Sequence, residues 1–206
     1  MKTQVIRFCL SVPLFVSLLS LQGCDNNDPV KEDVPETITE VTLTFTNDQG
    51  GTVRATASDP DGEGVQDMVV GYPIDLALNK TYTLKIKRIN GLAEPSSPNY
   101  DVSAEVAEEG NEHMFFFGWT NNLFTNPAGD GNIDGRSGAV NYYGASDSRD
   151  SKNLPLGLTT TWTTTSAVGT GTFRVMLKHL PAIKTETTGT DVGETDLDVT
   201  FDLVVH

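Results

Sequence analysis

The sequence predicts an all-β protein: a single antiparallel β-sandwich, immunoglobulin-like, with at most one short helix. Apolar residues recur at every second position in several segments, among them 41–45, 82–86 and 197–205. This is the period of a strand that buries one face and wets the other. Threonine is frequent in these segments and Gly- and Asp-rich turns separate them, as expected of short strands. Only residues 100–109, with Val102 and Val106 four apart, follow a helical period.

Residues 1–23 have the features of a lipoprotein signal peptide. Lys2 and Arg7 precede an apolar stretch, 8–21, that Pro13 interrupts. This stretch is shorter than the ~20 apolar residues of a permanent bilayer-spanning helix, so it is typical of a cleaved signal.

The predicted cleavage site precedes Cys24. Leu21 lies three positions before this cysteine and the small Gly23 directly before it, which is the pattern that lipoprotein signal peptidases recognise. We expect acyl chains, palmitate among them, on Cys24, and two or more such chains form a stable membrane anchor. The expected location is the outer membrane or the cell surface, with the periplasmic face left open.

An acidic linker separates the anchor from the folded domain. Residues 24–36 comprise the acylated cysteine and a polar segment with Pro29 and Pro35, a composition that cannot bury a core. Residues 37–206 are of a length that fits one domain. Cleavage removes Lys2 and Arg7 and no acid, so the net charge of −14 becomes about −16. Such a charge excludes nucleic acid as a partner.

Nine strands are expected in the domain. Their approximate bounds are 38–46, 51–58, 66–72, 80–89, 112–119, 139–146, 157–165, 170–180 and 194–205, and residues 47–51 form the first hairpin loop.

An enzyme is not expected. The sequence contains no phosphate-binding P-loop, nucleotide-binding glycine fingerprint or G-x-S-x-G motif. Of its two cysteines, Cys9 lies in the signal peptide and Cys24 carries the anchor, so residues 37–206 contain neither a thiol nor a disulfide.

Two histidines form a candidate metal site. His113 begins one predicted strand and His179 ends another, and each is in phase with the buried face of its strand. If the two strands are antiparallel neighbours, the side chains lie ~5 Å apart at Cβ. With a carboxylate from Glu109 or Glu112, they would form a set suited to zinc or another divalent ion. The alternative is that each histidine is a polar residue at the core edge, hydrogen-bonded to backbone.

A calcium site is a second candidate. Asp130, Asn132 and Asp134, followed by Gly135, match the opening of a D-x-[DN]-x-[DN]-G loop, in which alternate oxygens surround the ion. The twelfth position is Asn141 instead of Glu, so a plain turn is the alternative.

Trp119 and Phe124 are candidates for a surface contact. They lie where a predicted strand gives way to a long Gly-, Asp- and Asn-rich loop, and an exposed aromatic there could contact glycan or protein. The alternative is that they anchor the loop to the core.

Besides the cleavage site and acidic linker, several stretches carry a family resemblance: residues 41–45, 59–62, 78–82, 112–113, 156–164, 177–181 and 193–199. They resemble small Gram-negative lipoproteins often labelled "type 1 periplasmic binding fold superfamily protein". The chain departs from that group in a longer loop at about 120–140 and in Met114, where members tend to carry Gln. A type 1 binding fold alternates strands with helices in two lobes, whereas this sequence is patterned for strands, so the expectation stays all-β.

The resemblance implies a lipoprotein of a group often encoded beside TonB-dependent outer-membrane receptors. It also implies histidines at two strand ends, which coincide here with His113 and His179. The expected function is a non-enzymatic binding or accessory domain, in its specific form divalent-metal capture beside such a receptor. The alternative is a structural or adhesion-type surface domain that contacts glycan or protein through the 119–146 loop.

The anchor is tested by replacing Cys24 with Ser and labelling cells with a palmitate analogue. We expect the label to be lost, because serine lacks the thiol that the first acyl transfer uses. Continued labelling of the variant would contradict the anchor.

Overall fold

The computed structural model describes residues 37–59, 68–91, 94–97, 100–127 and 149–206. All of them belong to the second of two units, Asp33–His206. The predicted signal peptide and linker lie outside the described residues.

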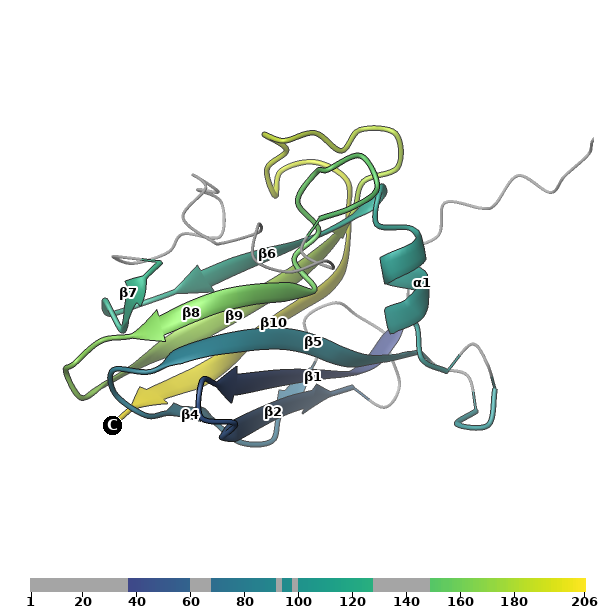
Figure 1. Cartoon of the computed structure of the whole chain (residues 1–206). Coiled ribbons are helices and arrows are strands. Elements are labelled where there is room, and N and C mark those ends of the chain that lie inside the picture. The colour runs from purple at the N-terminus through teal and green to yellow at the C-terminus, as the bar shows by residue number, and fades with distance from the viewer. Residues whose placement is uncertain (1–36, 60–67, 92–93, 98–99, 128–148) are drawn as a thin grey trace, which may run out of the picture. The chain divides into compact units, whose positions relative to one another are not determined.

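The described strands form two sheets (Figure 1). The six-stranded sheet has the order β3 (Val69–Val70), β2 (Thr52–Ser58), β1 (Ile38–Asn47), β5 (Thr81–Gly91), β8 (Thr159–Thr164) and β7 (Phe124–Asn126). The four-stranded sheet has the order β4 (Ile74–Leu76), β10 (Glu194–Val205), β9 (Gly169–His179) and β6 (His113–Trp119). One helix, α1 (Ser103–Glu108), joins β5 to β6.

The all-β prediction is confirmed, and the described residues contain one short helix, α1. Most predicted strands occur within one to three residues of their expected bounds. The expected strand at 66–72 is reduced to β3 in its described part, and the one at 139–146 lies outside the described residues. Periodicity did not reveal β4 and β7, which have three residues each. One strand pair, β4 with β10, is parallel. The immunoglobulin-like topology stays a prediction.

Aromatic rings join the two sheets. Trp162 on β8 is fully buried, and its ring centroid lies 4.8 Å from that of Phe173 on β9. Phe45 on β1 meets the same Phe173 ring edge-on at 5.7 Å. Edge-to-face pairs of this kind add to the stabilisation that comes from burying apolar area. The sandwich core is therefore centred on contacts between the inward faces of β1, β8 and β9.

The chain enters the sandwich at the end where β6 begins. Ile38, the first residue of β1, pairs with Gly91 at the end of β5. From there the chain passes through α1, whose Val102 N–H donates to the Ile89 carbonyl, and on to His113. We call this end of the sandwich the histidine end. Figure 1 shows α1 there, together with the loops that precede β8 and β10.

Replacing Trp162 with Ala should destabilise the protein by about 3–5 kcal/mol, because it removes a large buried side chain and leaves a cavity between the sheets. Urea unfolding followed by circular dichroism measures the change. Val168→Ala is the control, since Val168 is 72% exposed. Equal losses in the two variants would contradict the assignment of the core.

Candidate functional site

The two histidines lie directly opposite each other. β6 and β9 are antiparallel neighbours, and His113 is the register partner of His179. The adjacency on which the metal hypothesis depended is therefore present. Both side chains point into the sandwich, in phase with the pair Phe115 and Leu177, because alternate residues of a strand share a face.

The two imidazole rings are stacked. Their centroids lie 4.8 Å apart and their planes differ by 9°. The lone pair of an imidazole nitrogen lies in the ring plane, so two parallel rings do not direct their nitrogens at one point. Among the described residues, no group of three or more His, Cys, Asp or Glu side chains is arranged to hold a metal ion. The predicted pair is formed, but the predicted ligand set of the two histidines with Glu109 or Glu112 is not assembled.

His113 is held by the turn between α1 and β6. Its Nδ1 lies 3.2 Å from the Glu109 carbonyl oxygen, and because a carbonyl only accepts, this nitrogen carries the proton. Nε2 then faces the Asp196 carboxylate, with 3.7 Å between Nε2 and Oδ2, and both side chains are fully buried. A neutral ring with the proton on Nδ1 presents the lone pair of Nε2 toward Oδ2 of Asp196.

Asp196 is the residue that sequence reasoning missed. Strict alternation from residue 197 to 205 places Asp196 on the solvent face. In the structure the register of β10 against β9 shifts between Thr195 and Leu197, a β-bulge that leaves Asp196 as the extra residue. The bulge re-aims the carboxylate toward His113, where the side chain is fully buried. A bulge has no reliable sequence signal, although a polar residue next to a run of alternating apolar ones is a weak hint.

His179 has a different carboxylate neighbour. Its Nε2 lies 3.8 Å from Oε2 of Glu112, whose side chain is 44% exposed. Of the two histidines, His179 therefore has the neighbour that solvent reaches. Glu109 contributes its backbone carbonyl to His113, as the alternative to metal binding proposed.

Lys178 lies beside the pair on the opposite face of β9. Its Nζ donates to the Gly193 carbonyl at 3.0 Å and to Oγ1 of Thr195 at 2.9 Å. Gly193 has φ +70°, and a Cβ there would collide with the His179 carbonyl, so glycine is required at this turn. Burial lowers the pKa of Lys178, while the charges of Asp196, Glu194, Asp191 and Asp198 oppose that shift.

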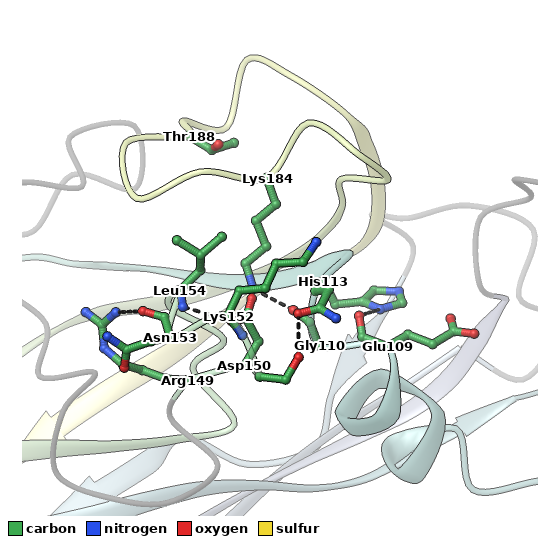
Figure 2. Close-up of polar contacts among 12 residues, drawn as sticks. Glu109, Gly110, His113, Arg149, Asp150, Lys152, Asn153, Leu154, Lys184 and Thr188 are labelled. Atoms are coloured by element: carbon green, nitrogen blue, oxygen red, sulfur yellow. Dashed lines mark hydrogen bonds and ion pairs between the residues drawn. The ribbon is translucent and has the colours of Figure 1, made fainter.

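A second polar cluster lies at the same end (Figure 2). Lys184 Nζ is 2.8 Å from Oδ2 of Asp150, with the two side chains 1% and 0% exposed, and it also donates to the Gly110 carbonyl. The other oxygen of Asp150, Oδ1, accepts N–H bonds from Lys152 at 2.9 Å and Leu154 at 2.8 Å. The cluster joins the turn before β6, the loop before β8 and the loop before β10.

The surface-contact prediction is wrong. Trp119 and Phe124 are 3% and 2% exposed, and their rings lie 5.1 and 5.0 Å from the Trp162 ring. They are core residues because β6 extends to Trp119 and β7 begins at Phe124. The prediction failed because the Gly-, Asp- and Asn-rich composition of the segment after Trp119 suggested an exposed loop. The predicted calcium residues Asp130, Asn132 and Asp134 lie outside the described residues.

No protein-family model, curated protein or solved structure matches the chain. Within the described residues, no helix is long and apolar enough to cross a membrane.

The lowered pKa of Lys178 predicts a pH-dependent stability. The folded state releases the Lys178 proton at a lower pH than the unfolded chain, so the unfolded state binds more protons as the pH approaches the ordinary lysine pKa of 10.5. Stability contributed by this group must therefore rise with pH in that window. We expect the unfolding free energy of the wild type, minus that of Lys178→Met, to increase between neutral pH and pH ~10.

Urea titrations at several pH values measure this difference. Lys85→Met, the same change at an exposed position, controls for the loss of one positive charge. A wild-type-minus-Lys178→Met difference that is flat or falls with pH would contradict the assignment.

Proposed function

We propose that the chain is a lipid-anchored, non-enzymatic binding or accessory domain of the cell envelope. The predicted signal peptide, Cys24 and the acidic linker support the anchor, and the two β-sheets of the described residues support a binding module. Divalent-metal capture at the histidine end is the specific form of this proposal.

The observation that carries the ligand hypothesis is the direct register of His113 and His179. Each ring has a carboxylate within 3.8 Å of its Nε2, Asp196 for His113 and Glu112 for His179. Two imidazoles and two carboxylates are the donor chemistry that zinc and other divalent transition metals prefer.

Metal capture requires one ring to leave the stack. His113 is fully buried and held through Nδ1 by the Glu109 carbonyl, so its Nε2 is the nitrogen left to bind a metal. His179 has the more solvated neighbour, Glu112, and it is the ring that would turn until its lone pair meets that of His113. Glu112 or Asp196 would complete the set.

The end of the sandwich at which β1 begins indicates which surface a membrane-bound partner would meet. The linker joins the sandwich at Ile38, at the histidine end, so a partner held at the same membrane is within reach of that end. A TonB-dependent receptor, which the family resemblance implies, is the partner proposed. The adhesion alternative loses its two aromatic contacts, since Trp119 and Phe124 are buried.

Isothermal titration with Zn²⁺ and Cu²⁺ on protein purified without chelators tests the ligand hypothesis. We expect binding that the double variant His113→Ala/His179→Ala abolishes and that Glu112→Gln weakens, because each change removes a donor. His206→Ala is the matched control: it removes an exposed histidine that pairs with Asp75 far from the site, and it should bind as the wild type does.

Absence of binding, or binding unchanged in the double variant, would refute metal capture at this pair. Binding lost in His206→Ala alone would assign the metal to the C-terminal strand instead.

A further inference from the structure

Lys184 and Asp150 form a buried pair in which an amine lies against a carboxylate. The amine nitrogen lies 2.8 Å from Oδ2, and both side chains are withdrawn from water. Removing an ammonium and a carboxylate from water is costly, and their mutual attraction repays this only in part. A neutral product that kept the same hydrogen bonds would remove that cost.

We infer that Lys184 and Asp150 form an intramolecular isopeptide bond, an amide between Nζ and Cγ. The inference does not depend on the proposed function. It rests on the burial of the pair and on how three surrounding hydrogen bonds are distributed over its atoms: two at Oδ1 of Asp150 and one at Nζ of Lys184.

The bond forms with loss of one water. The ammonium gives a proton to Oδ2, which leaves a neutral amine and a carboxylic acid. The amine lone pair attacks Cγ, and the electron pair of the C=O bond moves to Oδ1. A second proton passes from the nitrogen to the Oδ2 hydroxyl, the Cγ–Oδ2 bond breaks, and water departs. One ammonium and one carboxylate become one amide and one water, so charge and atoms balance.

The backbone stabilises the developing charge. Oδ1, where negative charge collects in the tetrahedral intermediate, already accepts the N–H groups of Lys152 and Leu154 at 2.9 and 2.8 Å. Paired N–H donors aimed at such an oxygen are the arrangement of an oxyanion hole. Oδ2, the leaving oxygen, is the one that faces Lys184.

The product retains the surrounding hydrogen bonds. The amide oxygen, formerly Oδ1, keeps both backbone N–H donors. The amide N–H can donate to the Gly110 carbonyl, which Lys184 already contacts. Gly110 also packs closely here, since a Cβ on it would lie 3.3 Å from Cβ of Asp150. Holding amine and acid in contact also replaces a bimolecular encounter with an intramolecular one, which favours condensation.

A cross-link at this place would have a structural consequence. It would join the loop before β8 to the loop before β10, positions 34 residues apart in sequence. Residues 37–206 contain no cysteine, so no disulfide can restrain these loops. A covalent closure restricts the unfolded chain in the way a disulfide does.

Mass spectrometry of a tryptic digest of the denatured full chain tests the inference. Acylated Lys184 resists trypsin, so we expect residues 150–152 joined to residues 179–206 in one species. Its mass should equal the summed masses of the free peptides 150–152, 179–184 and 185–206 minus two waters. One water corresponds to the uncut peptide bond after Lys184, and the other is lost when the isopeptide bond forms. Lys184→Arg, which keeps the positive charge, should give no joined species.

Free peptides 150–152 and 185–206 from the wild type, with no joined species, would overturn the inference. If the intact protein is lighter by one water but the two peptides are separate, the water was lost elsewhere, for example in a succinimide at an Asp–Gly sequence. That result overturns the inference equally. The wild-type digest decides the matter even where a variant fails to fold.

Discussion

The buried inner face of β9 is the constraint on which the rest of the structure depends. β9 lies between β6 and β10 in its sheet, and its apolar side chains must be covered by the other sheet. Phe173 does this with ring contacts to Phe45, Phe117, Phe124 and Trp162, at centroid distances of 5.7, 6.1, 6.2 and 4.8 Å. These contacts bring β1, β6, β7 and β8 to one strand, so the two sheets share a single core.

The same alternation that builds the core delivers His179 to its end. A strand cannot change the face of one residue without a bulge, so continuing the inward phase from Phe173 through Val175 and Leu177 places His179 inside. His113 follows from the pairing of β6 with β9 in the same way. The two imidazoles are thus the polar boundary of an apolar layer, and their stack continues the packing of that layer. A ligand that binds these histidines would therefore have to disturb side chains that also close the end of the core.

Local periodicity determined how much could be predicted. The alternation of β1, β5 and β10 and the opposition of the two histidines follow from strand geometry, which a sequence displays directly. The β-bulge that turns Asp196 inward, the three-residue strands β4 and β7, and the burial of Trp119 depend on neighbours distant in sequence. Lys184 and Asp150 come from two loops without periodicity, so nothing local indicated that they meet. The histidine pair and its neighbour Glu112 were therefore predictable, whereas Asp196 and the lysine–aspartate cluster were not.

The two polar clusters are coupled through consecutive carbonyls in one turn. Glu109 presents its carbonyl to His113, and Gly110 presents the next one to Lys184. Fixing Lys184 to Asp150 would hold this turn against the loop before β8, and with it the His113 ring. The turn thus holds His113 through Nδ1, whereas His179 lies beside Glu112, whose side chain is 44% exposed. In the proposed metal capture, His179 on β9 is therefore the ring that rotates, while His113 on β6 keeps its contact with the turn.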